Sequence, residues 1–279
     1  MLGGLARRAT AIDGIRTEAA EAGRSLLVID TGDNLFAEAL VHLAEREEAR
    51  TRARGIMRAM GEMSYVAMAV GARDLAGGYE LLLSASQNAG VRLLAANLEV
   101  SGGRVPIDAY EIIEAGKVRV ALLGLASADH SVQVSEVFRS AGVLASDPVT
   151  AAKNAIEEIG DRADIVIILG NLSEREVIRV GAEVSGAHLL LTGGGGHLTM
   201  AEEQREMLRY EPGSLGQILL QLDISPTPGT RLMDPRSRYS RTEPAAANVT
   251  SQVHPLHMEI AEDPRIKAIF PEEAEQQSP

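Results

Sequence analysis

Two carboxylates separated by Thr-Gly follow an apolar run near the start of the chain. The run over residues 25–29 predicts a buried strand, and Asp30 and Asp33 stand at its end. Acidic residues at the carboxyl end of a strand lie where open α/β sheets bind ligands. Two carboxylates this close repel each other, so they call for a cation, a basic partner or a shared proton. The segment therefore predicts either a hard-cation or phosphate site, or a solvated turn.

The composition restricts the classes of function. The 279 residues carry a formal net charge of −12, and only 3% of them are aromatic. This acidic balance argues against nucleic-acid binding, which needs a basic patch. No apolar run approaches the ~20 residues of a membrane span. Because the chain has no cysteine, it forms neither disulfides nor zinc–thiolate sites. Residues 1–8 lack the apolar region of a signal peptide, so none is predicted within this chain.

Apolar runs of strand length alternate with helical patterns along the sequence. This alternation predicts βαβ units with largely parallel pairing. Two of the runs, 118–124 and 217–224, also fit antiparallel strands of a second sheet. A charged run over 45–54 is interpreted as a solvated helix face, with a partner-binding surface as the alternative. Strands are expected over 25–29, 65–70, 92–96, 118–124, 165–169, 189–192 and 217–224, and helices over 5–23, 37–60, 78–89, 148–160, 174–184 and 263–270.

Glycine-containing turns end four of the predicted strands. They lie at 30–34, 70–78, 169–173 and 192–199. If all four lie on the same side of a parallel sheet, they converge on one crevice. The last turn contains four consecutive glycines, 193–196, which indicate either a relaxed loop or a nest of backbone N–H groups that binds an anion. Without a following Lys and Ser or Thr, this turn is not a P-loop.

The order of these segments resembles the metallophosphoesterase domain of the bacterial 5′-nucleotidase family, which is similar to the calcineurin-like phosphoesterases. The resemblance covers residues 3–270 and implies an α/β fold, a sandwich of two mixed β-sheets flanked by helices. The first strand of that fold would precede the point where this sequence begins. We expect a metallophosphoesterase-like domain over 1–224, a C-terminal extension packed on it over 225–270, and a disordered tail over 271–279. The matching pieces are Gly3–Arg8, Leu27–Asp33, Val70–Asp74, Leu94–Leu98, Val118–Leu125, Asp164–Asn171, Leu190–His197 and Glu262–Ile266.

The resemblance implies a dinuclear metal centre built from residues at strand ends. In such a centre two cations generate a hydroxide nucleophile and hold the phosphoryl oxygens. Asp33 matches the aspartate that bridges the metals. The position of the Asn ligand falls on Ala72, which has no donor atom. The position of the catalytic His falls on Arg73, which stays protonated at neutral pH and cannot shuttle a proton; Asp74 retains the acid that follows.

The remaining ligand positions are also degenerate. An isolated His ligand of the family falls on Asn171, and the two His of the last turn fall on Gly195 and His197. The chain thus keeps Asp33, His197 and Asn171 as weak candidate metal ligands and no catalytic residue. For Arg73 we favour a salt bridge to Asp33 or Asp30 over anion binding. Further residues are expected to support the site or to bind an anion: Asp30, Arg73, Asp74, Gly194, Gly195 and Gly196.

Two functions remain open from the sequence. The favoured one is a catalytically inactive domain that serves as a binding or structural module, with no cofactor and with a small anionic or phosphate ligand or a protein as its partner. The alternative is a metal-dependent phosphohydrolase for nucleotides or other phosphoesters, with Mn, Zn or Mg and with ligands supplied from outside this sequence. The resemblance implies a periplasmic or other extracytoplasmic location. The other histidines are expected to be structural or surface residues: His42, His130, His188, His254 and His257.

Overall fold

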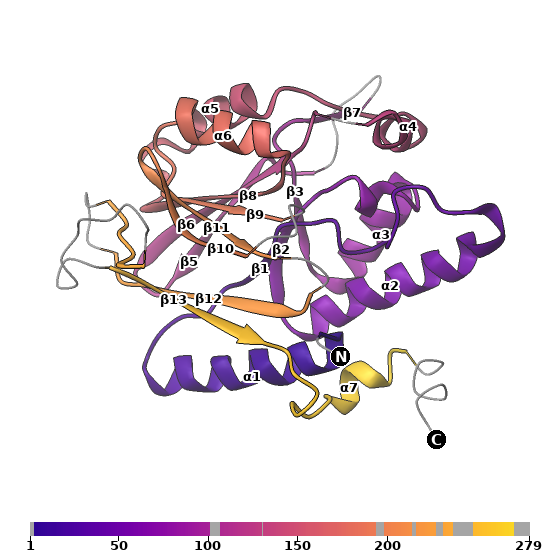
Figure 1. The fold of residues 1–279 in the computed structure, drawn as a ribbon, viewed down its shortest axis with the longest axis horizontal. Coiled ribbons are helices and arrows are strands. Elements are labelled where there is room, and N and C mark those ends of the chain that lie inside the picture. Colours follow the sequence, from indigo (N-terminus) through magenta and orange to yellow (C-terminus); the bar gives the residue numbers. More distant parts are fainter. Residues whose placement is uncertain are drawn as a thin grey trace.

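The chain folds into two main β-sheets that pack face to face, with helices on both outer sides (Figure 1). This arrangement confirms the predicted α/β sandwich. A computed structural model describes residues 3–100, 107–129, 131–193, 198–213, 216–226, 231–236 and 248–270.

The first main sheet is parallel, with three strands in the order β1-β2-β3. Helices connect its strands, as the alternation of patterns predicts. Ala53, Met57 and Met60 recur at helical spacing in α2 and are buried, so this face of the helix forms part of the core. The elements of this half are α1 (Leu5–Glu21), β1 (Val28–Asp30), the 3₁₀ turn Leu43–Glu45, α2 (Arg46–Glu62), β2 (Tyr65–Ala69), the 3₁₀ turn Arg73–Leu75, α3 (Tyr79–Ala89) and β3 (Arg92–Leu94).

The second main sheet has six strands in the order β10-β11-β9-β8-β6-β5. Its four inner strands are parallel, whereas β5 and β10 are antiparallel edge strands. The run predicted over 118–124 is β6, an inner strand parallel to β8. The elements are β5 (Tyr110–Ala115), β6 (Val118–Ala126), α5 (Pro148–Ile159), the 3₁₀ turn Gly160–Arg162, β8 (Ile165–Asn171), α6 (Glu174–Glu183), β9 (Leu189–Thr192), β10 (Leu198–Gln204) and β11 (Met207–Pro212).

Two further pairs of antiparallel strands complete the fold. The run predicted over 217–224 is β12, which pairs in antiparallel fashion with β13. Because β13 follows Ile224, the segment after that residue contributes directly to the sheet structure. The remaining elements are β4 (Leu98–Val100), which pairs with β7 (Val143–Ala145), α4 (Val132–Ser140), β12 (Ile218–Ile224), β13 (Val249–Pro255) and α7 (Pro264–Lys267).

Three apolar clusters define the layers. One lies between the two main sheets and includes Ala69, Leu122 and Tyr210. A second joins the first sheet to α1, α2 and α3, and a third joins the second sheet to α5 and α6. Ends of parallel strands of both sheets come together at a common edge, where the described site residues Asp33, Arg73 and Asn171 lie.

One predicted helix is wrong in its first part. The pattern predicts a helix from residue 37, but the helix α2 begins at Arg46, after the 3₁₀ turn 43–45. Residues 37–42 are irregular, and the carbonyl of Ala37 accepts a hydrogen bond from Nη1 of Arg73. A contact with the site turn thus takes the place of a helical hydrogen bond at this end of the predicted helix. No helix within the described ranges is long and apolar enough to span a membrane.

Candidate functional site

The ends of strands from both sheets come together, as the four turns predict. A Cβ atom placed on Gly193, after β9, would lie 2.5 Å from Oγ1 of Thr31 and 3.7 Å from Nδ2 of Asn171. A Cβ atom on Gly71, after β2, would lie 2.1 Å from Oδ1 of Asp33. Glycine at these two positions therefore allows the turns to approach one another. The turns after β1, β2, β8 and β9 thus meet at one place.

Asp33 is bound by the turn that faces it. Its Oδ1 accepts a hydrogen bond from the backbone N–H of Arg73 at 2.8 Å, and its Oδ2 accepts one from Nε of Arg73 at 3.3 Å. The side chain of Asp33 is 11% exposed and that of Arg73 is 37% exposed. Nη1 of Arg73 also donates to the carbonyl of Ala37. Both carboxylate oxygens of Asp33 are therefore engaged by the protein itself.

Asp33 also has an unusual backbone conformation. Its φ angle is +63°, in the left-handed region that few non-glycine residues adopt. The neighbouring Gly32 has φ +89° and lies against the carbonyl of Ala69. This tight turn directs the Asp33 side chain back toward Gly71 and Arg73. The conformation costs about 1–2 kcal/mol, so the surrounding hydrogen bonds must hold it.

Asp74 supplies those hydrogen bonds. It is fully buried, and its carboxylate accepts backbone N–H groups of Asp33, Asn34, Leu35 and Gly71 at 2.8–3.2 Å. Burial and the neighbouring charge of Asp33 raise the pKa of Asp74 to about 7, against the effect of the N–H donors. Asp74 therefore joins the turn after β1 to the turn after β2 and positions Asp33 opposite Arg73.

Asp30 acts within its own turn. Its Oδ1 accepts a hydrogen bond from the N–H of Gly32 at 2.8 Å and another from Nδ2 of Asn34. Burial raises the pKa of Asp30, and the nearby guanidinium of Arg8 works in the opposite direction. Among the described residues, Arg73 forms its ion pair with Asp33 and none with Asp30, so it pairs with only one of the two carboxylates.

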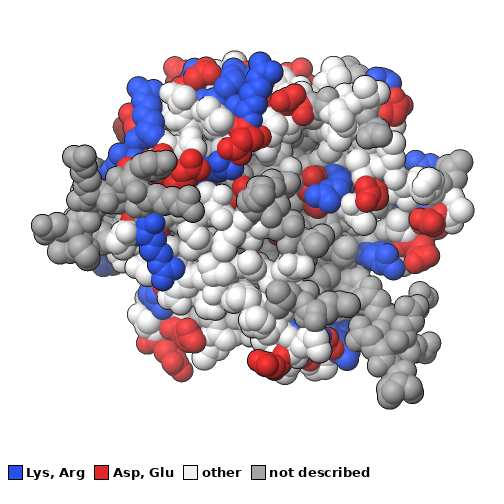
Figure 2. All heavy atoms as spheres, viewed as in Figure 1, with Lys and Arg blue, Asp and Glu red and all other residues white. Residues whose placement is uncertain are grey.

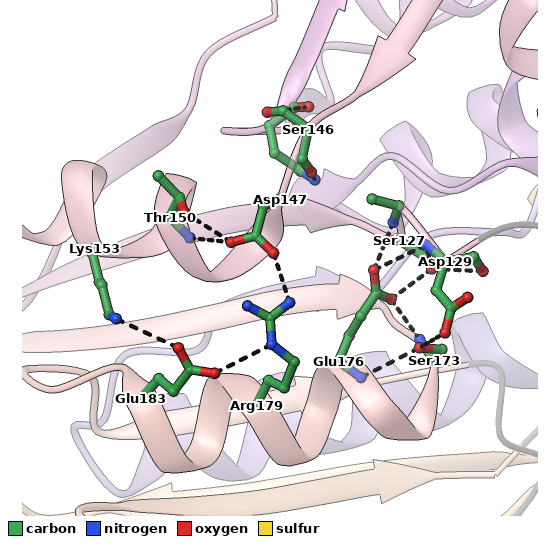
Figure 3. Close-up of polar contacts among 12 residues, drawn as sticks. Ser127, Asp129, Ser146, Asp147, Thr150, Lys153, Ser173, Glu176, Arg179 and Glu183 are labelled. Carbon is green, nitrogen blue, oxygen red and sulfur yellow. Dashed lines mark hydrogen bonds and ion pairs between the residues drawn. The ribbon is translucent and has the colours of Figure 1, made fainter.

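A second buried carboxylate, Glu176, lies near the carboxyl ends of the strands β6 and β8 of the larger sheet (Figure 3). Glu176 on α6 is 4% exposed and accepts hydrogen bonds from Oγ of Ser127 and from the N–H groups of Ala128 and Asp129. It also accepts the N–H of Ser173, with which it forms a capping box. Glu176 thus fixes the loop after β6 to the start of α6. The Ser-x-x-Glu pattern of a capping box at Ser173 and Glu176 is the sequence signal that indicates this residue.

Asn97, in one of the matching pieces, and two of the other histidines form structural contacts. The side chain of Asn97 is fully buried and bonds to the backbone of Ala126 and Ser146, so it links β4 to β6 and β7. His188 accepts the N–H of Val166, and its burial lowers its pKa. His254 contacts Gln221. Four predicted site residues, Gly194, Gly195, Gly196 and His197, lie outside the described residues, as do His130 and the tail 271–279.

The described residues do not fit a metal centre. Asp33 uses both oxygens on Arg73, and Ala72 offers no donor atom. Asn171 brings only a neutral amide to the meeting point of the turns. Over the described ranges, no group of three or more His, Asp or Glu side chains is arranged to hold a metal ion. Protein zinc sites use three or four ligands, a number that the described residues around Asp33 do not supply.

Comparison with known proteins supports the resemblance found in the sequence. The chain is 26% identical over 227 residues to the protein UshA of Escherichia coli, and the match covers 76% of this chain and 40% of that protein. It is 24% identical over 172 residues to a 5′-nucleotidase of Vibrio cholerae, and this match covers 61% of this chain and 30% of that protein. The chain matches no family model.

Solved structures show the same fold. The sulfate thiohydrolase SoxB of Thermus thermophilus matches with a TM-score of 0.78 at 17% identity, over 99% of this chain and 47% of that one. A 5′-nucleotidase precursor of Thermus thermophilus matches with a TM-score of 0.72 at 18% identity, over 99% and 53%. The calcineurin-like phosphoesterase YfkN of Bacillus subtilis matches with a TM-score of 0.70 at 15% identity, over 96% and 88%. The matched region makes up 76% of this chain but only 40% of the UshA proteins, so the chain spans less than half of the length of these relatives.

Proposed function

We propose that this chain, which is similar in sequence and fold to metallophosphoesterase domains of the 5′-nucleotidase family, is a catalytically inactive member of that family that serves as a binding or structural module. The observation that supports the proposal is the ion pair between Asp33 and Arg73. The guanidinium and the backbone N–H of Arg73 occupy both oxygens of the carboxylate that matches the bridging metal ligand. An arginine can neutralise this carboxylate but cannot generate a hydroxide or shuttle a proton at neutral pH.

The turns that meet near Asp33 offer neutral polar groups in place of metal ligands. Thr31, Asn171 and Gly193 lie close together there. We propose that a small-molecule ligand of this site is an anion such as phosphate. It would contact the exposed part of the Arg73 side chain. By the same resemblance we propose an extracytoplasmic location for the protein.

Three measurements test the proposal: phosphoesterase activity, the amount of bound metal, and the shift of the melting temperature by an anion. The purified chain is incubated with AMP and with p-nitrophenyl phosphate in the presence of Mn²⁺, and the Asp33→Ala variant serves as the control. We expect equal background rates for both proteins and less than stoichiometric bound metal. Stoichiometric metal together with turnover that Asp33→Ala abolishes would show an active phosphohydrolase instead. A shift of the melting temperature by AMP or inorganic phosphate, lost in Arg73→Ala, would support the anion-binding role.

A further inference from the structure

The segment that contains α7 is fixed to α1 by opposite charges. Glu262 pairs with Arg7 at 2.8 Å, and Arg265 pairs with Asp13 at 2.6 Å. Between these two contacts, Ile266 is 1% exposed and packs into the apolar cluster that joins α1, α2 and α3 to the first sheet. The helix α7 therefore has a defined position beside α1 (Figure 1).

Phe270 brings the end of this segment onto α2. A Cβ atom placed on Gly55 of α2 would lie 2.7 Å from Cε1 of Phe270 and 3.4 Å from Cγ2 of Ile269. Both side chains pack against the same apolar cluster. Glycine at position 55 thus leaves room for the phenyl ring on the surface of the helix. The part of the chain that follows Phe270 therefore starts on α2.

Exposed arginines flank this contact on α2. Arg52 and Arg58 stand three residues before and after Gly55, and side chains at this spacing are neighbours on a helix surface, about 5–6 Å apart. Arg52 pairs with Glu48 at 3.3 Å, whereas Arg58 and Arg54 form no ion pair among the described residues. Basic side chains lie next to acidic ones over α2, at the right of the view in Figure 2. In a chain with a net charge of −12, these three arginines form a basic surface, called the arginine face below.

We propose that the arginine face of α2 is the docking surface for the acidic segment 272–275 of the same chain. Residues 271–279 lie outside the described ranges. Their sequence contains three glutamates, Glu272, Glu273 and Glu275, and neither Lys nor Arg. The charge of this segment is thus complementary to that of the arginine face, in the same way that opposite charges join α7 to α1.

The length of chain after Phe270 suits this docking. An extended chain covers at most about 3.6 Å per residue, so Glu272 is within about 7 Å of Phe270 and Glu275 within about 18 Å. Because Phe270 lies against Gly55, the arginines on either side of Gly55 are within reach of these glutamates. The docking therefore requires no rearrangement of α7 or α2.

Electrostatics determine how strongly the segment docks. Exposed ion pairs are weak when they act singly, so docking depends on several pairs and on the short connection to Phe270. That connection keeps the glutamates at a high effective concentration beside the arginine face. Salt screens exposed charges, and the screening length falls from about 10 Å at 0.1 M to about 3 Å at 1 M ionic strength. The docked segment is therefore favoured at low salt and released at high salt. This inference does not rest on the proposed function.

Cleavage by a glutamate-specific protease tests the proposal, because docking covers its sites in the segment 272–275. The rate of such cleavage follows the population of the undocked segment when docking is fast. The chain of residues 1–279 is compared with the double variant Arg52→Gln/Arg58→Gln, which leaves the cleavage sites unchanged. We expect the segment to be cut at least about threefold faster in the double variant at low salt. Arg46→Gln is the matched control, at an exposed arginine of the same helix nine residues before Gly55, and should keep the parental rate.

The salt dependence gives a second readout from the same proteins. In the parent, raising the NaCl concentration to about 1 M should bring the cleavage rate up to that of the double variant. The ratio of the two rates corrects for any effect of salt on the protease itself. Equal melting temperatures of the parent and both variants, within about 2 °C, would show that these exposed substitutions leave the fold intact.

Three results would overturn the proposal. One is equal cleavage of the parent and the double variant at low salt. Another is the same acceleration in Arg46→Gln, because the net charge of α2 and not the arginine face would then control the rate. The third is protection of the parent that disappears on dilution, because the segment would then dock on a second copy of the chain.

Discussion

Replacing Arg73 by Ala tests whether the ion pair with Asp33 stabilises the fold. The backbone N–H of Arg73 remains in the variant, so only the interactions of the guanidinium are lost. A hydrogen bond to a charged group contributes about 1.5–3 kcal/mol. Because 37% of the Arg73 side chain is exposed, solvent screening reduces this value, and we expect a loss of about 1–2 kcal/mol. For a chain of this size that corresponds to about 2–4 °C in melting temperature.

Urea unfolding and differential scanning calorimetry measure the effect. A double-mutant cycle with Asp33→Asn isolates the pairwise energy, which we expect to be on the order of 1 kcal/mol. Arg139→Ala is the matched control, because Arg139 pairs with Glu136 on α4 and is 70% exposed; such a pair contributes less than about 0.5 kcal/mol. An Arg73→Ala variant as stable as the parent, or strictly additive effects in the cycle, would refute a stabilising pair.

Three further predictions concern the groups that hold the strand ends and helices. Asp74→Ala leaves four backbone N–H groups without their acceptor. A buried donor left unsatisfied costs about 1–3 kcal/mol, so urea unfolding should show a combined loss of about 3–5 kcal/mol, and a loss below about 1 kcal/mol would contradict its role. Glu176→Ala should speed hydrogen exchange of Ala128 and Asp129, whose N–H groups it accepts, and unchanged exchange would contradict this. Arg179 lowers the pKa of Asp147 to about 2. The stability from this pair is therefore present above pH ~4 and is lost as the pH falls through about 2. The difference in urea midpoint between the parent and Arg179→Ala should shrink over that range, and a constant difference would contradict the linkage.

Much of the fold follows from patterns that the sequence displays openly. The strands 65–69 and 189–192 and the helix 148–159 match their predictions closely, because each combines an apolar pattern with a clear start or stop signal. For α5 these signals are the Asp147 cap and Pro148 at the first turn. The sequence analysis missed β11, because buried Arg209 and Glu211 interrupt its apolar pattern. Their burial depends on ion pairs, including Glu174 on α6, and such partners come from the tertiary structure.

The site was predictable in its location and only partly in its chemistry. The glycine turns indicated that four strand ends meet, and the structure brings them together. The sequence did not determine whether Arg73 forms its salt bridge with Asp30 or with Asp33. It depends on the left-handed conformation of Asp33 and on Asp74, which holds the two turns together. These are contacts between turns about 40 residues apart in sequence, and the order of residues alone does not specify them.

The most direct test of whether the domain is inactive is to determine whether a metal ion binds at Asp33. Crystals of the protein are soaked in Mn²⁺, and anomalous diffraction locates bound manganese. The account predicts that the Arg73 guanidinium contacts Asp33 and that no anomalous peak lies within coordination distance of that carboxylate. A peak on Asp33, with Arg73 turned away from it, would contradict the account.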